Sequence, residues 1–238
     1  MRARYLGAAT VTTAGLLALA ACTHAAKPSA PASGPSSGPP RSPVAAIAAA
    51  QLATVRAGSA RVAVRLSSTT GGARSDCLHG DGADDFTRQQ GSLQVQFPAP
   101  GSPTVSLLCP PYGSAAVVVD HGVLYEKVPG FPKPWVRLAP RPDQNFFDPS
   151  LAVGRLPQVS TATVVGTDTL RGTATTHYRV SLTDGPGTFD VWLDGQGRVR
   201  EVRTGPGPFS LDVELYDFGT HVAVVLPPAD QVHPISAG

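Results

Sequence analysis

The sequence is poor in charged and aromatic residues. Charged residues make up 15% of the chain and aromatic residues 6%, so that Val, Leu and Ala must fill most of any hydrophobic core. Basic residues number 19 and acidic residues 17, and cleavage of an export signal containing Arg2 and Arg4 would leave 17 of each. A neutral chain does not favour nucleic-acid binding or a polybasic membrane patch. We therefore expect no nucleic-acid partner.

The chain also lacks the sequence motifs of common catalytic sites. Its histidines do not form a His-x-x-x-His or His-Glu-x-x-His pattern, no serine lies in Gly-x-Ser-x-Gly, and no dinucleotide fingerprint is complete. Asp120 and His121 are adjacent, which is more typical of a turn than of an acid–base pair. We expect no enzymatic activity and no cofactor.

A group of carboxylates also fails to match a metal site. Asp81, Asp84 and Asp85 lie close together, with Gly80 and Gly82 on either side of Asp81, but the closing Glu of a calcium loop is missing. We interpret this segment as a solvated loop next to Cys77, and we expect no metal ion.

No apolar run is long enough to span a bilayer, which needs roughly 20 strongly apolar residues. The stretch Leu6–Ala20 is shorter and rich in Ala and Thr; it follows Arg2 and Arg4 and ends in Leu-Ala-Ala-Cys22. This pattern is typical of a bacterial lipoprotein signal peptide over residues 1–21, with Cys22 acylated, for example by palmitate, as the new N-terminus. It predicts an extracytoplasmic protein, lipid-anchored to the cell membrane in the cell envelope. The alternative is an ordinary secretory signal with an incidental Cys.

The segment after Cys22 is built almost entirely of Ala, Ser, Pro and Gly. Such a composition cannot bury enough apolar surface to fold, so residues 22–43 are expected to form a disordered tether with a reach of roughly 50 Å. Residues 44–238 are long enough for one domain. We expect this domain to be a monomer.

Two further cysteines, Cys77 and Cys109, remain in an oxidising compartment. A disulfide between them is the favoured interpretation. A zinc site is a poor alternative because the pair lacks Cys-x-x-Cys spacing and a nearby pair of histidines.

Periodicity predicts an α+β domain. Residues 44–57 are rich in helix formers, with Ser42 as cap, Pro43 in the first turn and Gly58 at the end. Alternating apolar residues then predict strands, and the C-terminal half reads as an antiparallel meander. We expect one strongly curved antiparallel sheet, a half-open barrel, with helices covering its concave face. The expected strands are 62–66, 93–97, 115–119, 123–125, 161–165, 177–182, 189–193, 198–202 and 209–216, and a short helix is expected to start near 147–153.

Several short motifs follow one another in an order that is typical of a known protein family. They are Pro134-Trp135, Asp148-Pro149, Val165-Gly166 with His177-Tyr178, Val191-Trp-Leu-Asp194, and Tyr216-Asp-Phe-Gly219 before Pro227-Pro228. In this order the chain resembles the LppX/LprG-type (LppX/LprAFG) lipoproteins of actinobacteria, over roughly 44–232. The resemblance implies a LolA/LolB-like half-open barrel in which an apolar cavity holds the acyl chains of lipids or glycolipids. The Cys77/Cys109 pair is a departure from that family.

The predicted function is therefore the binding, and transfer, of lipid or glycolipid by a membrane-anchored lipoprotein. Periodicity alone favours a closed core built from the same apolar residues, and it is the family resemblance that favours a cavity. A second class of function, an envelope interaction or sensor module that binds a protein partner, also stays open. The residues predicted to line the cavity are Val62, Val64, Leu66, Leu93, Val95, Phe97, Phe189, Val191, Leu193, Leu211, Val213 and Leu215.

Overall fold

A computed structural model describes residues 42–70, 72–98, 113–127, 130, 132–138, 153–183, 188–204 and 207–234. These residues belong to one compact unit, Pro40–Gly238. The predicted signal peptide and nearly all of the tether lie outside the described residues, and so do Cys22 and Cys109. These assignments stay predictions.

The predicted N-terminal helix is confirmed as α1, Pro43–Arg56. The Ser42 side chain accepts a hydrogen bond from the Ala45 amide at 3.3 Å, and Pro43 occupies the first turn, where its missing N–H costs nothing. Gly58 follows the helix with a φ of +83°, a conformation that favours glycine. The helix buries Ile47, Ala50 and Thr54.

Twelve strands form one sheet in the order β12-β6-β5-β4-β3-β2-β1-β11-β10-β9-β8-β7. All neighbours pair antiparallel except β12 and β6, which are parallel. The sheet is not closed, because β7 and β12 are its two edges. The strands are β1 Ser59–Thr70, β2 Ala73–Asp85, β3 Gln90–Gln96, β4 Ser114–Asp120, β5 Val123–Lys127, β6 Trp135–Leu138, β7 Val159–Leu170, β8 Thr173–Leu182, β9 Thr188–Asp194, β10 Val199–Thr204, β11 Phe209–Tyr216 and β12 Val232–Pro234, with two 3₁₀ turns, η1 Leu156–Gln158 and η2 Ala229–Gln231.

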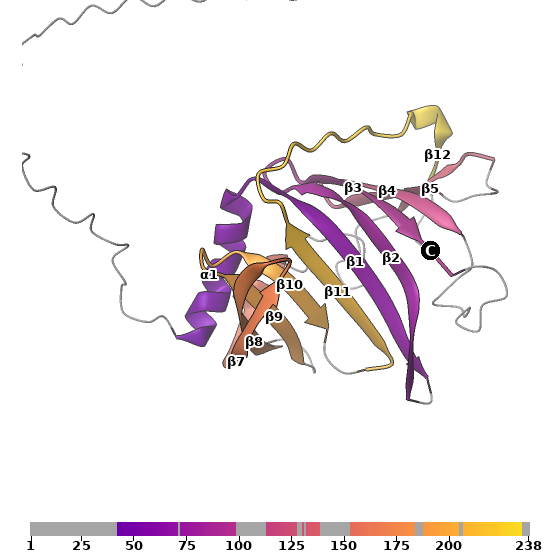
Figure 1. The fold of residues 1–238 in the computed structure, drawn as a ribbon. Helices are drawn as coiled ribbons and strands as arrows, with labels where there is room; N and C mark the ends of the chain where they lie inside the picture. The colour runs from indigo at the N-terminus through magenta and orange to yellow at the C-terminus, as the bar shows by residue number, and fades with distance from the viewer. Residues whose placement is uncertain are drawn as a thin grey trace, which may run out of the picture. The chain divides into compact units, whose positions relative to one another are not determined.

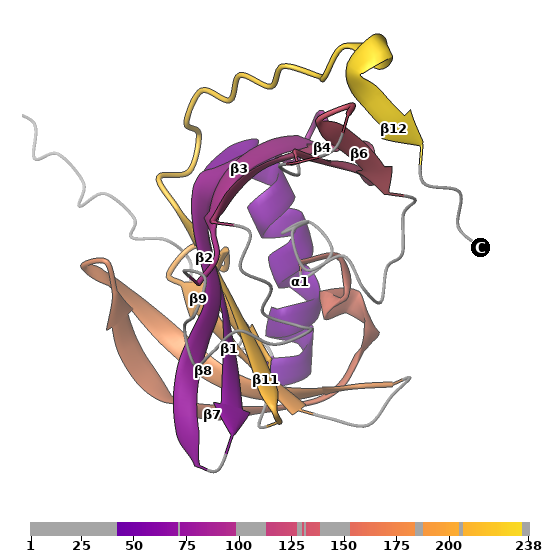
Figure 2. The ribbon, with the colours of Figure 1, turned by 90° about the vertical axis from the view of Figure 1, so that its right-hand side faces the viewer.

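The sheet is strongly curved, as Figures 1 and 2 show. In the view of Figure 2 the strands form an open arc, and α1 is seen inside this arc. The helix packs against β7, β10 and η1, at one end of the sheet. It is the one α-helix of more than a single turn within the described residues, so the predicted cover of several helices is not confirmed.

The predicted strands are confirmed, and several are longer than expected. The predicted turn at Asp120–Gly122 is also confirmed: His121 and Gly122 have φ values of +49° and +78° and connect β4 to β5. At the β9–β10 hairpin, the Asp194 carboxylate accepts hydrogen bonds from the amides of Gln196 and Arg198 at 2.9 and 3.0 Å. This local network fixes the turn between β9 and β10.

The interpretation of Asp81, Asp84 and Asp85 as a solvated loop was wrong. All three lie in β2, which pairs with β1 on one side and β3 on the other. Asp84 is buried. Glycine and aspartate are uncommon in strands, but tertiary pairing overrides that preference in the middle of a sheet. Strand β6 was also missed, and the helix start expected near residue 147 falls mostly outside the described residues.

Candidate functional site

The predicted cavity residues share one face of the sheet. Val62 and Val64 of β1 pair directly with Leu215 and Val213 of β11, and Val213 in turn pairs with Val202 of β10. Residues paired in this way project from the same face of an antiparallel sheet. The pairing continues the apolar face to β9. All twelve predicted residues are part of one hydrophobic cluster or pack against it.

Most of these side chains are buried. Nine of the twelve are buried, whereas Phe97, Phe189 and Leu211 are partly buried and pack against the others. Ile47 and Ala50 of α1 join the same cluster. These residues therefore stabilise the fold by packing, and their role as the lining of a ligand cavity stays a prediction.

Two glycines interrupt the apolar face at β2. Gly80 pairs with Val64 and Val95, and Gly82 pairs with Val62 and Leu93. A Cβ on Gly82 would overlap the Ser92 carbonyl oxygen and lie 2.8 Å from the Leu93 Cα. Because neither glycine has a side chain, the backbone of β3 lies close to β2 at Gly82, and the side chains of Val64 and Val95 lie over Gly80.

Glu126 places a carboxyl group on the apolar face. Glu126 of β5 pairs with Val117 of β4 and Val136 of β6, both of which are buried. Burial raises the pKa of Glu126 above its ordinary value. Sequence analysis missed this residue. The available signal was its spacing from Leu124, since residues two apart in a strand project from the same face.

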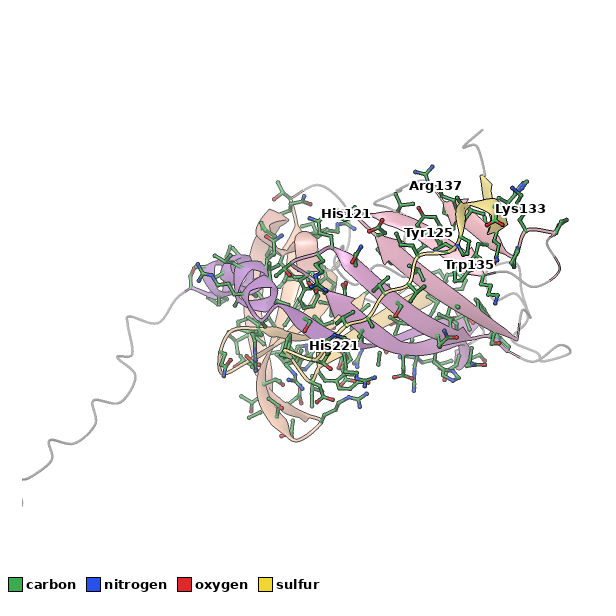
Figure 3. All side chains as sticks on the ribbon, turned by 90° about the horizontal axis from the view of Figure 1, so that it is seen from above. His121, Tyr125, Lys133, Trp135, Arg137 and His221 are labelled. Carbon is green, nitrogen blue, oxygen red and sulfur yellow. The ribbon has the colours of Figure 1, made fainter. Side chains whose placement is uncertain are left out.

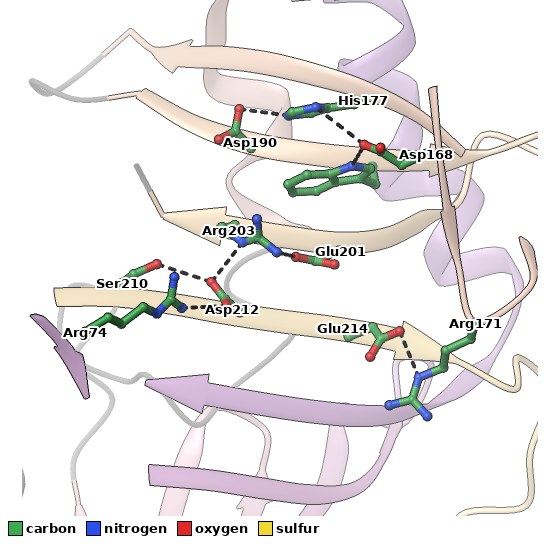
Figure 4. A network of polar contacts seen from close by, with 11 residues as sticks. Arg74, Asp168, Arg171, His177, Asp190, Glu201, Arg203, Ser210, Asp212 and Glu214 are labelled. Carbon is green, nitrogen blue, oxygen red and sulfur yellow. Dashed lines mark hydrogen bonds and ion pairs between the residues drawn. The ribbon is translucent and has the colours of Figure 1, made fainter. Parts of the chain in front are cut away.

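The opposite face of the sheet carries a network of ion pairs (Figure 4). The Arg203 guanidinium contacts the carboxylates of Glu201 and Asp212, the latter at 3.2 Å between Nε and Oδ1. Arg74 Nη2 reaches the other oxygen of Asp212 at 3.1 Å. Burial raises the pKa of the Glu201 carboxyl, and the positive charge of Arg203 partly offsets this rise. The network connects β2, β10 and β11.

A polar depression of about 410 Å³ lies over this network. Arg171 borders it and donates a hydrogen bond to Glu214 at 2.8 Å, which raises the pKa of the arginine. Most of the remaining lining is polar and of both charge signs, so this depression does not match the predicted acyl-chain cavity. The lining includes Arg65, His79, Asp81, Glu201, Arg203, Asp212 and Glu214.

A second polar cluster surrounds His177. Its ring stacks on Trp192, with the ring centroids 4.2 Å apart and the planes 14° apart. His177 Nε2 lies 3.0 Å from Asp190 Oδ1, and Trp192 Nε1 donates to Asp168 Oδ2 at 2.7 Å. These contacts include no hydroxyl or thiol that His177 could activate as a nucleophile. The cluster connects β7, β8 and β9.

Asp120 and His121 are also in contact. His121 Nδ1 lies 2.8 Å from Asp120 Oδ1, and Gln90 Nε2 donates to the same oxygen at 2.8 Å. These two hydrogen bonds lower the pKa of Asp120. His121 is exposed at the turn, as the sequence interpretation expected.

Neither a metal site nor a membrane-spanning helix is found in the part of the chain that the structure describes. Within it, no three or more His, Cys, Asp or Glu residues are arranged to hold a metal ion. No helix there is both long enough and apolar enough to cross a bilayer.

Cys77 lies in β2, is buried and takes part in a disulfide. The predicted partner, Cys109, lies outside the described residues. The pairing of these two cysteines therefore stays a prediction.

No protein-family model matches the chain, and no curated protein matches it. The structure is similar to that of LppX, a lipoprotein of Mycobacterium tuberculosis, with a TM-score of 0.50 and 14% sequence identity over 76% of this chain and 98% of LppX. At this identity the likeness concerns the fold. The chain has an LppX-type fold, as the sequence resemblance implied.

Other solved structures are less similar. LprF from Mycobacterium bovis gives a TM-score of 0.44 at 16% identity, covering 77% of this chain and 96% of LprF. A LolA superfamily protein from Nitrosomonas europaea gives 0.35 at 8% identity, covering 75% of this chain and 93% of that protein. These scores are too low to support an argument about function.

Proposed function

We propose that this protein is a lipoprotein, anchored through Cys22 outside the cytoplasm, that binds the acyl chains of lipids or glycolipids against the apolar face of its sheet. The observation that carries the proposal is the apolar face of an open, curved sheet in an LppX-type fold. No catalytic role is proposed.

The energetics favour a hydrocarbon ligand on such a face. Each methylene moved from water to apolar surroundings gains about 0.8 kcal/mol. The partly buried Phe97, Phe189 and Leu211 at the margin of the cluster offer contacts to a chain without disrupting the buried core. Glu126, which lies among the apolar side chains of Val117 and Val136, would offer a hydrogen-bond partner to a ligand hydroxyl.

The test is lipid capture by the predicted mature chain, residues 22–238 with Cys22→Ser to prevent acylation. The protein is incubated with a total lipid extract, re-isolated, and analysed by native mass spectrometry and organic extraction. We expect bound lipid, and we expect Phe189→Asn with Leu211→Asn to reduce it several-fold. Leu52→Asn on α1, where Leu52 is 52% exposed, is the matched control.

Unfolding curves of each variant establish that the fold is retained. Protein that stays empty under all loading conditions would contradict the proposal and favour the alternative, a module that binds a protein partner. Equal lipid retention in the Phe189→Asn, Leu211→Asn variant and in the Leu52→Asn control would show that the lipid does not bind at Phe189 and Leu211.

The anchor is tested separately in the native host. The full chain should fractionate with membranes and incorporate labelled fatty acid, and Cys22→Ser should abolish the incorporation. Labelled protein from the Cys22→Ser variant would exclude Cys22 as the acylation site.

A further inference from the structure

The outer face of the β5–β6 hairpin carries a compact group of basic and aromatic side chains. Strand register pairs Lys127 with Trp135, and Tyr125 with Arg137. The Lys127 ammonium lies 6.0 Å from the centroid of the Trp135 ring. Lys133 lies two residues before Trp135, in the bend that leads into β6. We call these five residues the basic-aromatic surface; Figure 3 shows four of them at one corner of the molecule.

The positive charges of this surface are not neutralised by neighbours. Lys127, Lys133 and Arg137 are exposed, and none forms an ion pair with a carboxylate in the described parts of the chain. Arg171 and Arg203, by contrast, are paired on the same side of the sheet. A chain with almost no net charge thus gathers three unpaired positive charges on one hairpin.

Acidic groups near this surface do not cancel it. Glu126 points to the opposite face, since it alternates with Tyr125 and Lys127 along β5. Asp120 is engaged by Gln90 and His121. Asp230, on η2 just before β12, is a single exposed carboxylate against three exposed cations.

Apolar side chains accompany the charges. Trp135 and Tyr125 are half-buried, and Val232 of β12 pairs with Trp135. Residues 220–228 form an extended C-terminal strap on the outside of the curl (Figures 2 and 3). The strap carries Val225, which is 82% exposed, and Leu226, which is 43% exposed. Aromatic rings and long basic side chains of this kind suit a water–lipid interface.

We propose that the basic-aromatic surface docks the domain on an anionic lipid bilayer, with the strap alongside it. Each Lys or Arg near an anionic leaflet contributes about fivefold to binding, so that three together give about a hundredfold. The tether predicted for residues 22–43 would keep the bilayer within reach at high effective concentration. This inference goes beyond acyl-chain binding, which requires no docking surface.

The experiment measures sedimentation of the chain 22–238 with Cys22→Ser on vesicles of phosphatidylcholine alone, or mixed in equal parts with phosphatidylglycerol. We expect binding to the anionic vesicles that weakens as salt is added. Lys127→Gln, Lys133→Gln and Arg137→Gln together should lower it by about a hundredfold. The matched control is Arg56→Gln, Arg61→Gln and Arg155→Gln, which removes the same charge from exposed sites elsewhere and should leave binding nearly unchanged.

Two further measurements complete the test. Tryptophan emission should shift to the blue on anionic vesicles, and the shift should be lost in Trp135→Phe, because the other tryptophan, Trp192, is buried. Lipid capture, measured as for the proposed function, should be unchanged by the triple Gln substitution. Loss of vesicle binding therefore tests the docking proposal independently of the proposal that the protein binds acyl chains. Equal loss in both triple variants, or binding that is independent of phosphatidylglycerol, would overturn the docking proposal.

Discussion

The Thr54 hydroxyl of α1 accepts a hydrogen bond from the Val199 amide at the start of β10, at a distance of 2.9 Å. The same hydroxyl donates to the Ala50 carbonyl one turn earlier in the helix, at 2.8 Å. Thr54 and Val199 are both fully buried. One side chain thus fixes the helix to the sheet and satisfies a strand amide that water cannot reach.

Thr54→Val should destabilise the protein by about 1–3 kcal/mol, because it leaves the Val199 amide buried without a partner. Thr54→Ser retains the hydroxyl and should cost about 1 kcal/mol, for the lost methyl group. Denaturant unfolding of both variants checks this. A Val variant as stable as the Ser variant would show that the hydrogen bond contributes little.

Gly82→Ala should destabilise the domain by more than about 2 kcal/mol, since the added Cβ meets backbone atoms of Ser92 and Leu93 that cannot move without disturbing β3. Gly166→Ala is the matched control: it lies in a strand, and nothing comes within 4 Å of its Cβ. The control should be neutral or slightly stabilising. Thermal unfolding compares the two, and equal effects would contradict the close approach of the β3 backbone to Gly82.

Glu126→Gln should stabilise the protein at neutral pH. Burial raises the folded-state pKa of Glu126, so the folded protein binds the proton more tightly than the unfolded chain does. Stability is therefore lost as pH rises from the ordinary pKa of glutamate through the raised value. Below that window the carboxyl is neutral in both states and the benefit of Gln should vanish.

Unfolding free energies measured across pH test this prediction. Glu214→Gln, which removes the ion pair to Arg171, is the control and should not stabilise the protein. A Glu126→Gln benefit that is constant across pH would show that the charge of Glu126 is not its cause.

The predicted Cys77–Cys109 bridge should appear as one linked peptide pair in a non-reducing digest. It closes a loop of about 30 residues, and its reduction should lower the free energy of unfolding by roughly 3–4 kcal/mol. Cys22→Ser should leave that free energy unchanged. Recovery of Cys109 as a free thiol in native protein would exclude the pairing.

Much of the secondary structure could be predicted from short stretches of the sequence. Ser42, Pro43 and Gly58 mark the ends of α1 because caps and helix starts depend on neighbouring residues alone. Alternation likewise assigned Val191 and Val213 to one face, and the register confirms this because both residues pair with Val202. Side-chain direction along a strand repeats every two residues, so it needs no tertiary information.

Strand β2 could not be recognised in the same way. The sequence Gly80-Asp81-Gly82 is typical of a loop. These residues form a strand only because they pair with β1 on one side and β3 on the other. The placement of Glu126 among Val117 and Val136 has the same origin, because those contacts come from neighbouring strands.

The sequence by itself determined the apolar and polar faces of the strands, the helix and its limits, and the features that predict an acylated Cys22. Only the tertiary structure decided that Lys127, Trp135 and Arg137 lie side by side, although the overall charge gave no sign of a basic surface. Composition sums charge over the whole chain, whereas strand register decides which charges are neighbours. The same register brings β1 against β11, from opposite ends of the domain, to form the apolar face on which the proposed function depends.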